Sequence, residues 1–319
     1  MRTIAIANQK GGVGKTTTVA SLAGTLASRA RRVVVIDLDP QSHLTASLGL
    51  DPRESAYTSY DVLTNDLPLD DALHHVRDHL WLIPANLNLA AAEQELVSVV
   101  GRETILRDAL EAAGQHWDYV LIDCPPSLGM LTLNALCTAR ELFIPVQPHF
   151  LSLQGLSQLL ESILLVQRRI NPALQVTGLL FCMYDARTSL SGEIVGDIEN
   201  FFQAQRDHPS PWQNIHIFAT RIRGNIKLAE CPSHGRTINE YAPLCNGAVD
   251  YAALADEVEA MHARRGEPAA APVHHAPAES QVYAADADAA VPDTQPLAAD
   301  PPAAPDDASQ NAQPDSNWQ

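Results

Sequence analysis

A short apolar run that leads directly into a glycine-rich loop and then a helix is the feature that most limits how this chain can fold. Thr3 to Ala7 is the apolar run, a helix-length segment extends from Thr16 to Arg29, and between them lies Lys10-Gly11-Gly12-Val13-Gly14-Lys15-Thr16-Thr17. Backbone N–H groups can approach a polyphosphate closely only where no Cβ blocks them. The order strand, loop, helix therefore predicts a phosphate-binding loop.

Each residue of this loop has a predicted task. The helix start adds its positive end to the N–H groups of Gly11, Gly12, Val13 and Gly14. Lys15 is expected to reach the β- and γ-phosphate oxygens, Thr16 to ligate Mg²⁺ through its hydroxyl, and Thr17 to touch the α-phosphate. Lys10, a second lysine at the start of the loop, is unusual, and a solvated lysine at a strand end is the alternative reading.

Acidic residues end two further apolar runs. Asp37 and Asp39 close the segment from Val33, and Asp123 closes the segment from Tyr119. Because ligands of open α/β sheets bind at the carboxyl ends of the strands, these carboxylates are expected beside the phosphate loop. Asp123 has the form of a residue that holds Mg²⁺ through water. A single Asp at a strand end can also cap a helix or form a turn.

The distribution of apolar runs predicts the fold class. Near-continuous β-branched runs indicate strands that are covered on both faces, and helix-length segments lie between them. We expect an α/β fold, a doubly wound, mostly parallel sheet with helices on both faces. The predicted strands are 3–7, 33–37, 80–84, 119–123, 142–146, 176–182 and 215–219, and the predicted helices include 16–29, 103–113, 153–169, 192–203 and 248–264.

Composition changes near residue 265. From Gly266 to Gln319 there are nine acidic residues and no Lys or Arg, with many Ala and Pro. Such a segment buries too little apolar surface to offset its ordering entropy, so we predict a folded domain over 1–265 and a disordered acidic tail over 266–319. The net charge is −17, and −8 remains without the tail. Any contact with nucleic acid must therefore come from a local basic patch.

The chain carries no pattern for export or for a membrane. Its five cysteines are widely spaced and include no CxxC pair, which fits a reducing compartment without disulfides. No stretch approaches the length of apolar residues that spans a bilayer, and the N-terminus lacks a signal pattern. We therefore expect a cytoplasmic protein.

Several sequence blocks of this chain resemble those of the ParA/MinD family of ATPases with a deviant Walker A motif, and of the ParA/Soj branch in particular. The resemblance covers 1–264 and includes KGGVGKTTT at 10–18, VVVIDLDPQSHLT at 33–45, DYVLIDCPPSLGMLTLNAL at 118–136 and NIKLAECPSHGRTINEYAP at 225–243. It implies a P-loop fold that hydrolyses ATP slowly with Mg²⁺. It also implies that two copies dimerise around the nucleotide.

The resemblance assigns further roles. Lys10 is similar to the family's signature lysine, which reaches the partner's nucleotide, and Asp39 to the residue that positions the attacking water. Asp37 and Asp123 match carboxylates of the magnesium site. The segment Ala229 to Ser233, including Pro232, matches the one beside the adenine.

Nonspecific DNA binding is implied through basic residues on the dimer surface. Here Arg187 and Lys227 stand at the matching positions, with Arg221, Arg223 and Arg236 close in sequence, and a solvated surface is the alternative reading for all five. Relatives carry Ile-Pro-Arg-Asn where this chain has Ile222-Arg223-Gly224-Asn225, so the basic residue is displaced by one place.

The predicted function is partition of a chromosome or plasmid by a nucleoid-associated ATPase that a centromere-binding, ParB-like protein activates. Positioning of another cargo, such as a chemoreceptor array or a secretion or cellulose machine, is the main alternative. A membrane-cycling division regulator like MinD would need a basic amphipathic C-terminal helix, which the acidic end of this chain lacks. An iron–sulfur ATPase would need paired cysteines in other surroundings.

Overall fold

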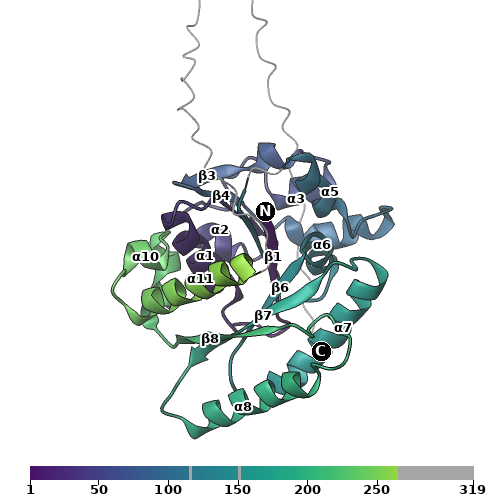
Figure 1. The fold of residues 1–319 in the computed structure, drawn as a ribbon. Coiled ribbons are helices and arrows are strands. Elements are labelled where there is room, and N and C mark those ends of the chain that lie inside the picture. Colours follow the sequence, from purple (N-terminus) through teal and green to yellow (C-terminus); the bar gives the residue numbers. More distant parts are fainter. Residues whose placement is uncertain (115–116, 150–151, 265–319) are drawn as a thin grey trace, which may run out of the picture. The chain divides into compact units, whose positions relative to one another are not determined.

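A computed structural model describes residues 1–114, 117–149 and 152–264 (Figure 1). The strands are β1 (Arg2–Ile6), β2 (Val33–Asp37), β3 (His74–Arg77), β4 (Leu80–Ile83), β5 (Tyr119–Asp123), β6 (Glu141–Val146), β7 (Gln175–Tyr184) and β8 (His216–Arg223). They form one sheet in the order β3-β4-β2-β5-β1-β6-β7-β8. Only the β3–β4 pair is antiparallel among the described strands. The predicted doubly wound, mostly parallel sheet is confirmed.

The helices lie between these strands. They are α1 (Lys15–Ser28), α2 (His43–Ser47), α3 (Ser59–Thr64), α4 (Leu89–Glu95), α5 (Ile105–Ala112), α6 (Met130–Thr138), α7 (Ser152–Arg169), α8 (Ser189–Ala204), α9 (Ile226–Glu230), α10 (Ile238–Tyr241) and α11 (Asn246–Arg264). Short 3₁₀ turns are η1 (Leu69–Ala72), η2 (Leu96–Ser98) and η3 (Cys231–His234). The long helices lie within a few residues of their predicted bounds. The polar edge strand β3 and the short helices were not predicted, because they carry too few periodic apolar positions.

Side chains alternate between the two faces of the sheet, and each face has its own core. Ile4 and Ile6 of β1 pack with α1 and α11, whereas Ala5 packs with the cluster that holds α3 to α8. In Figure 1, α1, α10 and α11 accordingly lie together, apart from α5, α6 and α7. The near-continuous apolar runs follow from this double cover, because successive residues of a strand face opposite sides.

The central strands end at the same level, which positions the site. In the parallel register, Asp123 of β5 lies beside Ile6 of β1 on one side and beside Asp37 of β2 on the other. Hydrogen bonds continue this register past the strand ends, from Cys124 N to Ile6 O at 3.3 Å and from Leu38 N to Asp123 O at 3.1 Å. The loops after β1, β2 and β5 therefore leave the sheet side by side.

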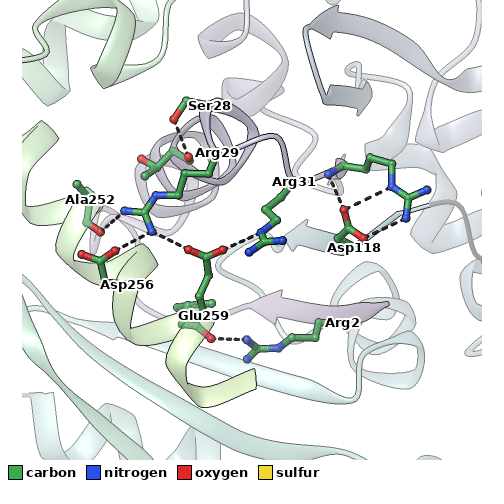
Figure 2. A network of polar contacts seen from close by, with 11 residues as sticks. Arg2, Ser28, Arg29, Arg31, Asp118, Ala252, Asp256 and Glu259 are labelled. Atoms are coloured by element: carbon green, nitrogen blue, oxygen red, sulfur yellow. Dashed lines mark hydrogen bonds and ion pairs between the residues drawn. The ribbon is translucent and has the colours of Figure 1, made fainter. Parts of the chain in front are cut away.

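A network of charged side chains fastens α11 to the end of α1 (Figure 2). Arg29 donates to Glu259 at 2.7 Å and to the carbonyl of Ala252 at 2.9 Å, and it pairs with Asp256 at 2.8 Å. Arg31 donates to the other oxygen of Glu259 at 2.7 Å. Each pair is partly exposed and contributes little alone, and the network adds to the apolar packing of α11 against α1.

The predicted acidic tail lies outside the described residues, so its boundary stays a prediction. None of the helices in the described residues has the length and apolar character that crossing a bilayer requires.

Gly178 of β7 provides a test of the packing within the sheet. A Cβ at this position would lie 2.6 Å from ring atoms of both Phe143 and Phe218, which meet edge to face at a centroid distance of 5.2 Å. We expect Gly178→Ala to lower the free energy of unfolding by about 1–3 kcal/mol, because the rings must shift. Urea unfolding measures this change.

Gly192, an exposed glycine of α8, is the matched control. Nothing lies within 4 Å of a Cβ at this position, so Gly192→Ala should raise stability by up to about 1 kcal/mol through helix propensity. Equal effects of the two substitutions would contradict the packing described for Gly178.

Candidate nucleotide site and basic cleft

The loop between β1 and α1 has the backbone of a phosphate cradle. Gly12 and Gly14 have φ angles of 71° and 93°, in the left-handed region that favours glycine. Nothing lies within 4 Å of a Cβ built on Gly11 or Gly12. Val13, which follows these open positions, is buried and anchors the loop. The first turn of α1 contains no acidic residue, so its positive end is available to an anion.

The two lysines of the loop lie in different environments. Lys15 is 7% exposed, and its Nζ donates to the carbonyl of Lys10 at 3.1 Å. Burial lowers the pKa of Lys15, while the charges of Asp123 and Asp39 act in the opposite direction. The side chain of Lys10 is exposed, and its backbone N–H donates to Asn8 Oδ1 at 3.0 Å. Lys15 is thus held inside the site, whereas Lys10 remains at the surface.

Thr16 and Asp123 form the part of the site that best fits a divalent cation. The Thr16 hydroxyl donates to Asp123 Oδ2 at 2.7 Å. Asp123 Oδ1 is buried and has no hydrogen-bond partner among the described residues. Burial, followed by the neighbouring charge of Asp37, raises the pKa of Asp123. A bound cation or its water would satisfy this oxygen, so the donor set fits Mg²⁺, which favours one or two oxygen ligands beside phosphate.

Asp37 and Asp39 differ although they are two residues apart. Asp37 is fully buried, and its oxygens accept from Asp39 N at 3.1 Å, from Thr45 N at 2.9 Å and from the Thr45 hydroxyl at 2.7 Å. These donors oppose the effect of burial, which raises the pKa of Asp37 to about 6. Asp39 accepts from Gln41 N at 2.9 Å and lines the cleft beside the loop. Asp37 therefore holds the turn that presents Asp39.

A cleft of about 500 Å³ brings most of the predicted nucleotide residues together. Its polar end is lined by Gly11, Gly12, Gly14, Lys15, Thr16, Thr17 and Asp39. Lys10, Val13, Asp37, Asp123 and Pro232 do not line it, although Asp123 contacts Thr16. Pro232 is exposed, and the cleft is reached instead by Ala229. The role predicted for Pro232 stays a prediction.

The other end of this cleft was missed in the sequence. Its lining includes Cys182, Met183, Ile222, Leu228 and Tyr251, and the buried Tyr251 hydroxyl lies 3.2 Å from Thr18 Oγ1. The end of β7 could have been noticed, because a parallel strand ends at the ligand-binding edge. Tyr251 could not, since its position depends on the packing of α11 against α1.

Three of the five predicted DNA-contacting residues line a second cleft. Arg187, Arg221 and Arg223 share it with the segment from Met183 to Ala186. Lys227 and Arg236 do not line it. Met183 and Arg223 line both clefts, so the basic cleft adjoins the candidate nucleotide site.

Most of these basic side chains already have a partner in the chain. Arg187 pairs with Asp185 at 2.8 Å although its side chain is 88% exposed, Arg223 pairs with Asp250 at 2.6 Å, and Lys227 pairs with Glu230 at 2.8 Å. Arg221 donates to the Tyr184 hydroxyl at 2.9 Å. Arg236 is exposed, and its side chain has no hydrogen bond or ion pair within the described part of the chain. The positive potential of the cleft is accordingly reduced.

Thr45 allows the environment of Asp37 to be tested by pH. Its hydroxyl donates to Asp37 and accepts from Ala85 N at 2.9 Å. Below the Asp37 pKa of about 6 the folded carboxyl is protonated, and above it the buried carboxylate needs its donors. We expect Thr45→Val to cost about 1–3 kcal/mol more at about pH 8 than at about pH 5. Thr45→Ser, which keeps the hydroxyl, should show no such difference in urea unfolding.

Comparison with known proteins identifies the family. A family model described as an AAA domain matches residues 1–176. The sporulation initiation inhibitor protein Soj of Bacillus subtilis is 43% identical over 81% of this chain and 98% of its own length. The chromosome partitioning protein ParA of Myxococcus xanthus is 41% identical over 81% of this chain and 87% of its own.

A solved structure agrees with this assignment. The cobyrinic acid a,c-diamide synthase of Mycobacterium smegmatis, crystallised with an ATP analogue and magnesium, is 37% identical with a TM-score of 0.70. The similarity covers 84% of this chain and 97% of that one. With its glycine-rich loop, its mostly parallel sheet and these relatives, the chain belongs to the ParA/MinD family of P-loop ATPases.

Proposed function

We propose that this protein is a Mg²⁺- and ATP-dependent partition ATPase that dimerises on ATP, binds DNA nonspecifically and releases it on hydrolysis. The nucleotide chemistry is supported by the open glycine loop beside the hydrogen-bonded Thr16 and Asp123. The Oδ1 atom of Asp123 is buried and has no hydrogen-bond partner in the described residues. The role in segregating a chromosome or plasmid is supported by similarity to proteins named Soj and ParA. The protein would act in the cytoplasm, on the nucleoid.

Within one subunit, the loop binds the triphosphate and Lys15 contacts its β- and γ-phosphate oxygens. Gly11, Gly12, Val13 and Gly14 offer backbone N–H groups, while Thr17 contacts the α-phosphate. Thr16 and Asp123 hold Mg²⁺, and Asp37 supports them by fixing the neighbouring turn. When bound, Mg²⁺ neutralises negative charge that develops on the phosphates.

The exposed Lys10 is the residue through which two subunits share the nucleotide. Its side chain is exposed beside the two open glycines, and its carbonyl already holds Lys15. A second subunit facing this loop would bring its own Lys10 to the phosphates. The negative triphosphate then attracts two lysines, one from each subunit, and this attraction stabilises the dimer. Loss of the γ-phosphate removes negative charge and weakens the attraction.

Hydrolysis is proposed to be slow until a partner completes the site. Asp39 aligns the attacking water, and its side chain accepts from the Gln41 N–H at 2.9 Å. Turnover then depends on a centromere-binding, ParB-like protein that orders the site. Loss of the γ-phosphate then separates the dimer and releases DNA.

Two other functions remain as alternatives. Positioning of a non-chromosomal cargo uses the same ATPase core, so only the cargo distinguishes it. The synthase from Mycobacterium smegmatis was crystallised with an ATP analogue too, so ATP hydrolysis alone does not separate amide formation from partition. ATP-dependent retention on DNA does separate them, and the arginines of the basic cleft favour partition.

The dimer is tested with a hydrolysis-impaired variant. Asp39→Ala should remain a dimer when saturated with Mg²⁺ and ATP, because the γ-phosphate that attracts both Lys10 side chains is kept. Size-exclusion chromatography with light scattering measures the mass with ATP and with ADP. Adding Lys10→Ala to this variant should return it to a monomer. A monomeric Asp39→Ala protein with bound ATP would contradict the proposed cycle.

DNA contact is tested by charge reversal in the basic cleft. Arg187→Glu should leave the basal ATPase rate unchanged and weaken DNA binding equally across sequences. Removing a phosphate contact should also lower the slope of binding against salt concentration by about 1. The matched control is Arg206→Glu, at an exposed arginine just after α8. Unchanged DNA binding by the Arg187→Glu, Lys227→Glu double variant would overturn this surface assignment.

A further inference from the structure

Glu93 of α4 lies against Gly129, the residue that precedes α6. A Cβ on Gly129 would be 1.9 Å from Glu93 Oε1 and 2.8 Å from its Cδ. The φ of Gly129 is −83°, which any residue can adopt. Glycine is therefore needed here for space rather than for backbone conformation, and the side chain of Glu93 occupies that space.

The charge of Glu93 faces the positive end of α6. Glu93 Oε1 is buried and has no hydrogen-bond partner among the described residues. The first turn of α6 (Met130–Thr138) has no acidic residue, and no side chain caps its start. A carboxylate near a helix N-terminus is stabilised by the helix dipole. Glu93 thus supplies from α4 the negative charge that α6 lacks in its own sequence.

The loop that Glu93 holds begins at the candidate magnesium residue. Asp123 ends β5, Pro126 lines the nucleotide cleft, and Gly129 ends the loop under Glu93. The Thr132 hydroxyl of α6 donates to the carbonyl of Ser127 in this loop at 2.6 Å. The nucleotide cleft and the Glu93 contact are therefore opposite ends of one short segment.

The rest of α6 is held independently of Glu93. Asn134 Nδ2 donates to the carbonyl of Arg102 at 2.8 Å, and Asn134 Oδ1 accepts from Leu106 N at 3.2 Å. Asn134 thus fixes the middle of α6, and Glu93 lies against its N-terminal end. This end carries the loop that leads to Pro126 and Asp123.

We propose that Glu93 is a positioning residue for ATP hydrolysis, an inference that rests on the proposed ATPase function. With its negative charge beside the N-terminus of α6, in the space that Gly129 leaves open, the Glu93 carboxylate holds the 124–129 loop, which follows Asp123 and brings Pro126 to the nucleotide cleft. The substrate is gripped mainly by the glycine loop and Lys15, which Glu93 does not contact. Loss of Glu93 is therefore expected to slow hydrolysis more than it weakens ATP binding.

Steady-state ATPase kinetics of the full chain test this inference. Glu93→Ala should lower kcat about tenfold and change KM by less than about twofold, because small displacements of reacting groups slow the chemical step. Glu93→Gln keeps the side-chain volume and removes the charge, and it should lower kcat by a similar factor. Gly129→Ala should do the same, because its methyl group displaces the carboxylate.

The double variant Glu93→Ala, Gly129→Ala shows whether the two single substitutions slow hydrolysis through their shared contact or through separate effects. Once Glu93 is shortened, the Gly129 methyl group has room, so the double variant should be no slower than Glu93→Ala alone. Glu95→Gln, on the same helix with its carboxylate 3.0 Å from the Tyr60 hydroxyl, is the control and should keep the wild-type kcat.

Three results would overturn the inference. They are a wild-type kcat in either Glu93 variant, additive losses in the double variant, and a fall in thermal stability that accounts for the lost activity. An inactive wild-type protein, tested with Mg²⁺, ATP and DNA, would instead reject the proposed function. The two failures are thus distinguishable.

Discussion

The hydrogen bond between the Thr16 hydroxyl and Asp123 Oδ2 joins the first turn of α1 to the end of β5. It forms because β1 and β5 are parallel neighbours in register, so the loop after one strand meets the carboxylate at the end of the other. Burial makes the ionised carboxylate costly, and its second oxygen is left for a ligand. The candidate cation site and the phosphate loop therefore both depend on the order of the central strands.

Helix α11 supports both clefts from the far end of the chain. Tyr251 meets Thr18 beside the nucleotide cleft, while the adjacent Asp250 pairs with Arg223 at the boundary with the basic cleft. The ion pairs of Arg29 and Arg31 with Glu259 hold this helix against α1 (Figure 2). A helix that ends at residue 264 therefore shapes a site whose phosphate loop begins at residue 10.

The basic cleft shows why residue type alone says little about binding to a polyanion. Arg187, Arg223 and Lys227 each have an acidic neighbour, so part of their charge is already balanced. The displaced arginine of the Ile222 to Asn225 block is one of these, since Arg223 pairs with the buried Asp250. An acidic chain that binds DNA through such residues is expected to do so weakly and with strong salt dependence.

The sequence by itself determined the sheet class, the phosphate loop and the acidic strand ends, because these depend on local patterns: continuous apolar runs, glycines before a helix, and Asp after a buried strand. Three features depended on the tertiary structure alone. Asp37 accepts a hydrogen bond from the Thr45 hydroxyl, Tyr251 lines the nucleotide cleft whereas Pro232 does not, and Glu93 lies against Gly129. Each of these depends on contacts between segments that are far apart or not periodic, and packing brings them together only once both faces of the sheet are covered.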